Sequence, residues 1–118
     1  MGIQNLTKDI IFINLPAKPH VGDELERINQ FVSYGCDCDV IIDFSGVEIL
    51  TSASLSNLML LDQFLKPLNR QLVLCNVPLP IQCIFIRSGL ETFFEFAHNK
   101  SAAVEVIRGQ DYGESEQI

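Results

Sequence analysis

The sequence predicts an α/β domain built on a mixed sheet, and two observations support that prediction. Apolar, β-branched segments alternate along the chain with segments whose apolar residues recur every three or four positions, as strands alternating with helices do. Strand-helix-strand units require parallel pairing, whereas the first two apolar segments are close enough for an antiparallel hairpin. We therefore expect a single domain with a sheet of four to five strands and about four helices.

Composition excludes several classes of function. The chain has 118 residues, with 8 basic against 15 acidic side chains, a net charge of −7 and 47% hydrophobic residues. Such a chain can bury a core without disulfides or metal, and its charge repels nucleic acid and anionic lipid alike. Apolar runs such as Leu58–Leu61 are far shorter than the roughly 20 residues of a membrane span. The first residues lack the pattern of a signal peptide, so we expect a cytoplasmic protein.

The first third of the chain predicts a hairpin and a helix. Two apolar segments, Ile3–Leu6 and Ile10–Ile13, flank a polar turn and are expected to pair. After a loop with two prolines, the acidic turn at Asp23 and Glu24 begins an amphipathic helix that ends at Gly35. The apolar face of this helix is expected to consist of Leu25, Ile28, Phe31 and Val32.

The middle of the chain predicts a central strand and the longest helix. Val40–Phe44 is nearly all apolar, which is typical of a strand covered on both faces. The helix runs from about Ser52 to Leu68, with Leu55 and Met59 outside its main apolar stripe. The stripe is expected to contain Leu58, Leu61, Leu65 and Leu68, with Leu60 and Phe64 beside it.

The rest of the chain predicts two further strands and two helices. Prolines mark the start of one helix and a glycine its end, and the polar, acidic residues after 108 predict a frayed terminus. The expected elements are a strand over Gln71–Val77, a helix from Pro78 to about Ser88 capped by Gly89, a short strand over Phe93–Phe96, and a helix from about Asn99 to Ile107.

The search for catalytic chemistry finds no nucleotide-binding, hydrolase or metalloprotease motif. His20 and His98 could act as bases only if the fold placed them beside a nucleophile, and the carboxylates are scattered. The four cysteines form no CxxC pair, so we expect buried, reduced thiols, and neither a metal nor a cofactor. If the protein were an enzyme instead, the candidate chemistry would be that of a thiol at the CxC turn of Cys36 and Cys38. Such a thiol would require a lowered pKa. We expect no enzyme.

A run of hydroxyl side chains opens the longest helix. The run contains four hydroxyl residues, although a helix cap requires only one: Thr51, Ser52, Ser54 and Ser56. Two interpretations compete, a purely structural N-cap and a modification or docking site, because a helix start also favours an added phosphate.

Three blocks of the sequence resemble the STAS family, the domain of bacterial anti-sigma factor antagonists and of sulfate-transporter tails. Val40–Leu55, read as VIIDFSGVEILTSASL, resembles its core signature; Gln71–Val77 resembles its next strand; and Phe85–Phe94, read as FIRSGLETFF, resembles its helix-Ser-Gly-Leu turn and following strand. The resemblance covers roughly residues 10 to 107. It implies a STAS-like domain over residues 1–108, with an acidic, disordered tail over 109–118.

The chain departs from the family at the residue that matters most for regulation. The family signature is Asp-Ser-Ser-Gly-Leu, and in sporulation and stress-response members a partner kinase phosphorylates its second serine. Here Thr51, Ser52, Ala53, Ser54 and Leu55 stand at those five positions. Ala53 has no hydroxyl, so the acceptor is displaced to Ser52 or Ser54, or the protein is an unswitched antagonist, or it is a scaffold subunit. We favour Ser52, which is in register with a family serine.

The resemblance implies a regulator that acts by binding. Its partner would be a kinase-type anti-sigma factor or a serine kinase-like protein, with other STAS proteins as further candidates. We expect the partner-binding residues to be Thr51, Ser52, Ala53, Ser54, Leu55 and Met59. The alternatives are an unswitched STAS scaffold subunit of a signalling complex and a small-ligand-sensing STAS module.

Overall fold

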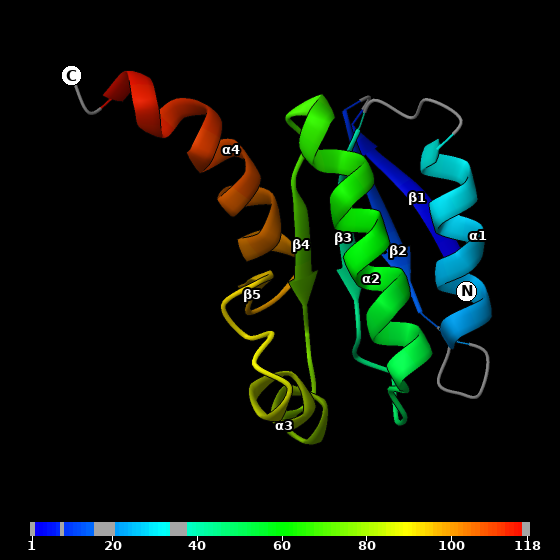
Figure 1. Ribbon diagram of the computed structural model, residues 1–118. Coiled ribbons are helices and arrows are strands. Elements are labelled where there is room, and N and C mark those ends of the chain that lie inside the picture. Colours follow the sequence, from blue (N-terminus) through cyan, green and yellow to red (C-terminus); the bar gives the residue numbers. More distant parts are fainter. Residues whose placement is uncertain (1, 8, 16–20, 34–37, 117–118) are drawn as a thin grey trace.

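The computed structural model describes residues 2–7, 9–15, 21–33 and 38–116. In these residues strands and helices alternate after an initial hairpin, as the sequence predicts (Figure 1). The elements are β1 (Gly2–Thr7), β2 (Ile10–Asn14), α1 (Val21–Ser33), β3 (Asp39–Asp43), α2 (Ser52–Leu65), the 3₁₀ turn η1 (Lys66–Leu68), β4 (Leu72–Cys75), α3 (Leu79–Arg87), β5 (Glu95–Ala97) and α4 (Lys100–Glu116).

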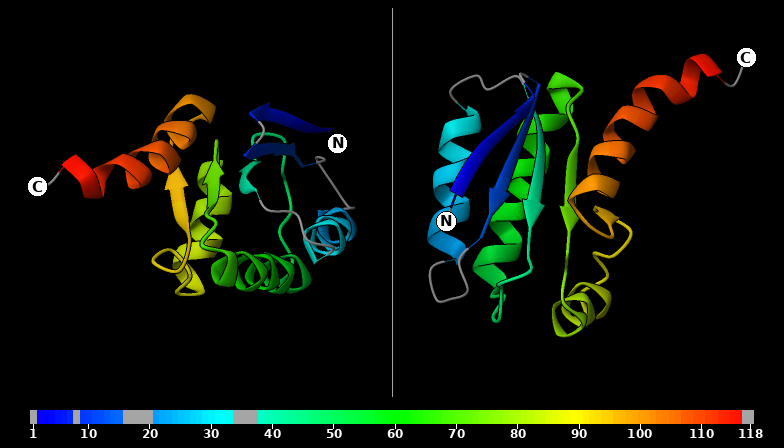
Figure 2. Two further views of the ribbon diagram at one scale, coloured as in Figure 1. Left: turned by 90° about the horizontal axis from the view of Figure 1, so that it is seen from above. Right: turned by 180° about the vertical axis from the view of Figure 1, so that it is seen from behind.

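The sheet is mixed, with five strands in the order β1-β2-β3-β4-β5. β1 pairs antiparallel with β2, and the pairs β2–β3, β3–β4 and β4–β5 are parallel. α1, α2 and α3 lie on one face, and the start of α4 covers the other, while its end projects away from the sheet (Figure 2). The expected hairpin, the central position of β3 and the mixed α/β class are confirmed.

Two apolar cores explain why the three residues between the terminal aspartates of β3 are all apolar. The larger core lies between the sheet and α1, α2 and α3, and the smaller one lies under α4. Val40 and Ile42 belong to the larger core and Ile41 to the smaller, because neighbouring side chains of a strand point to opposite faces. Both faces of β3 therefore exclude water.

The apolar stripe of α2 is narrower than predicted. Ser54, Leu58, Leu61 and Leu65 are its buried residues, whereas Leu60, Phe64 and Leu68 are exposed. α2 ends at Leu65, and the turn η1, which contains Pro67, carries Leu68 out of the helical register. Leu55 and Met59, predicted outside the stripe, are half-buried and pack against the larger core.

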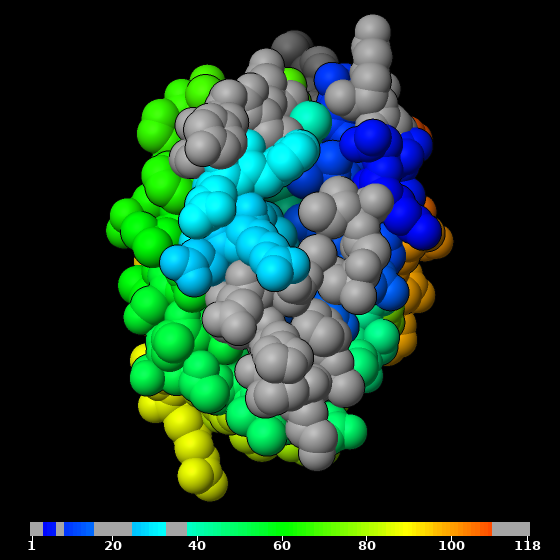
Figure 3. All heavy atoms as spheres, turned by 90° about the vertical axis from the view of Figure 1, so that its right-hand side faces the viewer, coloured from blue at the N-terminus to red at the C-terminus, as the bar shows by residue number. Residues whose placement is uncertain are grey.

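Phe31 on α1 also differs from its prediction, since 48% of its surface is exposed while Leu25, Ile28 and Val32 are buried. Phe31 lies at the edge of the helix face that these three residues form, and Figure 3 shows α1 between α2 and the β1–β2 hairpin. The predicted Gly35 terminus lies outside the described residues.

The last two elements are shifted or extended relative to the prediction. β5 is Glu95–Ala97, so Phe93 precedes the strand, and its ring lies 5.2 Å from the Lys66 ammonium. α4 continues to Glu116, where the sequence predicted a disordered tail from residue 109. Once a helix has started, each added residue gains a hydrogen bond for the two torsions it fixes, so a polar continuation can remain helical.

Burial of the cysteines is only partly as expected. Cys75 is buried, Cys38 is half-buried, and Cys83 is exposed on the outer side of α3. Cys83 corrects the prediction of buried thiols, because a helix that covers one face of a sheet leaves its other side in water. Cys36 lies outside the described residues.

Gly89 ends α3 in a conformation that other residues adopt at a cost. Its φ is 76°, the Leu90 N–H donates to the Phe85 carbonyl at 2.9 Å, and the Gly89 N–H donates to the Ile86 carbonyl at 3.1 Å. This pair of bonds is the Schellman motif.

We expect Gly89→Ala to lower the free energy of unfolding by about 1 kcal/mol and Gly89→Asn by less, because asparagine tolerates the left-handed region better. A Cβ at Gly89 meets no atom within 4 Å, so only the backbone is strained. Urea unfolding measures the change. The control is Gly109→Ala inside α4, which is expected to stabilise, since its Cβ also meets no atom within 4 Å. Equal effects at the two positions would contradict this account.

Candidate functional site

The start of α2 is capped by two of the four hydroxyl residues. Thr51 is the N-cap, with extended backbone angles of −96° and 169°, and its Oγ1 accepts from the Ser54 N–H at 3.1 Å. The Ser54 Oγ lies 3.1 Å from the same Thr51 Oγ1. The Leu55 N–H donates to the Thr51 carbonyl at 3.0 Å. Thr51 and Ser54 therefore form a structural N-cap, which is one of the two interpretations of the hydroxyl run.

The remaining predicted residues divide into exposed and buried groups. Thr51, Ser52 and Ala53 are exposed. Ser54 is 1% exposed, because its side chain faces the sheet with Leu58 one turn later. A kinase cannot reach a hydroxyl in that position, so Ser54 does not fit the acceptor role, and Ser52 is the candidate that remains. Leu55 and Met59 are half-buried and pack against the larger core, so they offer a partner less surface than the exposed residues do.

The loop from Ser45 to Leu50 holds the start of α2 in place. The Asp43 Oδ1 accepts from the Ser45 N–H at 2.7 Å, and the Val47 N–H donates to the Phe44 carbonyl at 2.9 Å. Val47 and Leu50 are buried, at 3% and 8% exposure, and belong to the larger core. Two apolar side chains thus fix the loop on the domain, so the residues between them keep a defined position.

Ile49 is a site residue that the sequence reasoning did not identify. It lies between the buried anchor Leu50 and the exposed Glu48, and 49% of its surface is exposed. The sequence signal was an apolar residue in the short link between a strand and a helix, and such a residue can equally be buried. We refer to Ile49, Thr51, Ser52 and Ala53 together as the exposed turn.

The exposed turn can accept a phosphate without electrostatic conflict from its own helix. Ser52 is the first residue of α2, and the first turn of α2 contains no acidic residue. Helix N-termini carry unpaired N–H groups and a partial positive charge, which stabilise an anion by about 0.3–1 kcal/mol at an exposed position. An exposed hydroxyl at Ser52 and an adjacent helix N-terminus are thus both present at this site.

The thiol and histidine alternatives receive no geometric support. Cys36 and His20 lie outside the described residues, and Cys38 packs half-buried against the larger core. The fold places His98 at the wall of a pocket, whereas Cys75 is buried and its pKa is raised to about 12. A catalytic thiol needs the opposite shift.

The part of the chain that the structure describes has neither a metal-binding cluster nor a helix that could span a membrane. No group of three or more histidine, cysteine, aspartate or glutamate side chains within these residues could hold a metal ion. Of the helices in the described part of the chain, not one combines the length and the apolar character needed to cross a membrane.

Comparison with known proteins identifies the fold. No family model and no curated protein sequence matches the chain. Solved structures do match: the anti-sigma factor antagonist SpoIIAA in its unphosphorylated form is similar with a TM-score of 0.75 at 19% identity, over 92% of this chain and 96% of that one. A STAS domain protein from Planctomyces limnophilus gives a TM-score of 0.77 at 17% identity, over 90% and 97%.

A third similar structure comes from the stressosome, described as a signal integration and transduction hub, with a TM-score of 0.71 at 15% identity over 93% of this chain and 98% of that one. The chain therefore has the fold of a STAS domain, as its sequence resemblance predicts.

Proposed function

We propose that this protein is an anti-sigma factor antagonist-like regulator that binds a kinase-type anti-sigma factor through the exposed turn and is switched by phosphorylation of Ser52. The observation that carries the proposal is the exposure of Thr51, Ser52 and Ala53 at the first turn of α2 on a STAS fold. SpoIIAA, one of the similar structures, is an anti-sigma factor antagonist that has been solved in unphosphorylated and phosphorylated forms.

The phosphorylation step needs only an exposed hydroxyl on this chain. The Ser52 Oγ attacks the γ-phosphorus of ATP held by the kinase, the bond from that phosphorus to the β–γ bridging oxygen breaks, and ADP leaves. The hydroxyl proton passes to a base on the kinase. The product carries about −1.5 to −2 additional charge at the docking surface, which the partner must desolvate or match with cations. Release of the partner follows from that mismatch.

The area that a stable interface buries implies that apolar residues near Ser52 also contact the partner. A stable interface buries about 1,200–2,000 Å² in total, more than the three small residues Thr51, Ser52 and Ala53 can supply. Ile49 has nearly half of its surface exposed beside Thr51, and it lies on a loop that Val47 and Leu50 hold rigid. Burial of a preordered side chain costs little entropy, so Ile49 is the residue most suited to anchor a partner.

The test is capture of partners from native lysate on the tagged chain, followed by mapping of phosphate on the recovered chain. We expect an ATPase with kinase activity among the captured proteins, and phosphate on Ser52. Ile49→Asp is expected to weaken capture about tenfold or more, the effect of losing an apolar hot spot. Gln63→Asp is the matched control, because Gln63 is exposed on α2 beyond the exposed turn and the added charge is equal.

The outcomes separate the alternatives. Capture that Ile49→Asp and Gln63→Asp weaken equally would contradict docking through the exposed turn. Kinase capture without phosphate on Ser52 in any growth state would overturn the switch and leave an unswitched antagonist. Recovery of other STAS chains alone would favour the scaffold function.

A further inference from the structure

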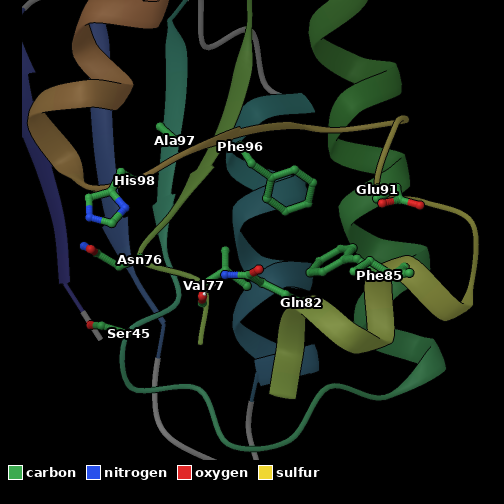
Figure 4. A pocket seen from close by; sticks show the side chains of 10 residues that line it. Ser45, Asn76, Val77, Gln82, Phe85, Glu91, Phe96, Ala97 and His98 are labelled. Atoms are coloured by element: carbon green, nitrogen blue, oxygen red, sulfur yellow. Dashed lines mark hydrogen bonds between the residues drawn. The ribbon is translucent and has the colours of Figure 1, made fainter. Parts of the chain in front are cut away.

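A pocket of about 630 Å³ lies at the carboxyl ends of β3, β4 and β5, beside α3 (Figure 4). Its size falls within the range of about 300–1,000 Å³ that is usual for small-molecule sites. Its polar wall includes Ser45, Asn76, Gln82, Glu91 and His98, and the ring of Phe96 contributes an apolar part. The carboxyl edge of parallel strands is where open α/β sheets bind their ligands. None of these residues belongs to the exposed turn.

Hydrogen bonds to neighbouring residues determine how the side-chain amides of Asn76 and Gln82 are oriented. The Asn76 Nδ2 donates to the Asp43 Oδ2 at 3.1 Å, and the Gln82 Nε2 donates to the Val77 carbonyl at 2.8 Å. A carboxylate and a carbonyl can only accept, so both amides must direct a nitrogen to these partners. The Asn76 Oδ1 and the Gln82 Oε1 are then the acceptors left for a ligand.

The charge of the pocket agrees with its hydrogen-bonding character. The Glu91 side chain lies in the wall, and the Asp43 carboxylate lies directly behind Asn76. The nearby Lys100 ammonium lies 4.7 Å from the Phe12 ring centre and is not part of the wall. The Ser45 hydroxyl, the His98 ring and the second N–H of Gln82 can also donate, but among the described residues of the wall the only charged side chain other than His98 is the Glu91 carboxylate, which favours an occupant with N–H donors and positive charge.

The apolar part of the pocket favours a flat occupant. Phe96 is half-buried, and its ring packs against that of Phe85 with 5.2 Å between centroids and planes at 76°. In Figure 4, Gln82 lies between the aromatic rings and the group formed by Asn76 and His98. A planar ring could therefore contact Phe96 while its donors reach the amide oxygens.

We propose that this pocket binds a small planar organic cation, an aromatic ring that carries several N–H donors. The Phe96 ring contacts the ring of the ligand, the Asn76 Oδ1 and the Gln82 Oε1 accept its N–H groups, and Glu91 pairs with its charge. This inference goes beyond the proposed function and does not depend on Ser52 or on a protein partner.

The test is an NMR titration of the full chain, labelled with ¹⁵N, with benzamidinium as the probe. We expect saturable shifts of the Asn76 and Gln82 side-chain amide signals with a Kd of about 1 mM or tighter, a usual affinity for so small a ligand. Benzoate has the same ring and the opposite charge, and we expect no saturable shift with it. Saturation by benzoate at similar concentrations, or no saturation by benzamidinium up to about 10 mM, would overturn the proposal.

Two matched variants locate the binding. Glu91→Gln is expected to weaken benzamidinium binding about threefold, the usual effect of one exposed ion pair. Glu95→Gln removes the same charge from an exposed residue whose β5 position places it on the opposite sheet face from Phe96, so binding should be unchanged. Gln82→Met keeps the length of the side chain and removes its acceptor, and should also weaken binding. Equal effects of the two glutamate variants would show that the probe responds only to net charge, which contradicts the assigned site.

Discussion

Replacing Phe85 with alanine is expected to lower the free energy of unfolding by about 3–5 kcal/mol, the cost of emptying a large, fully buried site. Phe85 is 1% exposed, and its ring centre lies 6.2 Å from that of Phe44, 5.8 Å from that of Phe94 and 5.2 Å from that of Phe96. All three pairs are edge-to-face, which adds to the stabilisation from burial. One side chain therefore joins the residue after β3, helix α3 and the segment around β5.

Urea unfolding followed by circular dichroism measures this loss. Ile86→Ala is the control from the same helix, because 52% of Ile86 is exposed, and we expect it to cost under about 1 kcal/mol. Domains of this kind have total stabilities of about 5–15 kcal/mol, so Phe85→Ala could unfold the chain outright. Phe85→Leu keeps most of the volume and should remain folded at a smaller cost. A loss at Phe85→Ala no greater than that at Ile86→Ala would refute the central role of this ring.

Cys75 in the native protein is expected to react with N-ethylmaleimide at pH 8 about a thousandfold more slowly than in the unfolded chain, because the thiolate is the reactive form. Burial, followed by the nearby Asp43 carboxylate, raises the pKa of Cys75 from 9.0 to about 12, although the Lys100 ammonium acts in the opposite direction. At pH 8 that change reduces the thiolate fraction by about three orders of magnitude. Peptide mapping by mass spectrometry measures labelling at each cysteine, and exposed Cys83 shows that the reagent is active.

The same shift makes stability depend on pH in the alkaline range. Between about pH 9 and 12 the unfolded chain has lost the Cys75 proton while the native chain retains it. The unfolded state then binds fewer protons, so the free energy of unfolding falls as pH rises. Cys75→Ala removes this contribution and should flatten the decline. Rapid labelling of native Cys75 at pH 8 would contradict both expectations.

The carboxyl edge of the sheet brings the two proposed sites close together. Asp43 ends β3, and its two carboxylate oxygens accept from the Ser45 N–H at 2.7 Å and the Asn76 Nδ2 at 3.1 Å. Ser45 begins the loop that leads to the exposed turn, and Asn76 lies in the pocket wall. Asp43 thus fixes the geometry of both sites, which makes it a residue to preserve in any variant designed to test one of them alone.

Much of the fold could be predicted from the sequence because its signals are local. Local signals include the apolar runs that became β2, β3 and β4, the prolines at the start of α3 and the glycine after it, and each specifies backbone conformation over a few residues. The exposed turn was predicted in part for the same reason, since a hydroxyl at Thr51 marks a helix start whatever surrounds it.

Local pattern alone determined the order of strands and helices, the caps and the position of the hydroxyl run. Tertiary packing decided which apolar and hydroxyl side chains reach solvent, because burial depends on the surface that an element meets. Leu60 and Ser54 illustrate this, since the leucine predicted beside the core stripe is exposed and the serine predicted for modification is buried. The pocket likewise exists only where β3, β4, β5 and α3 meet, and no segment of the chain encodes it by itself.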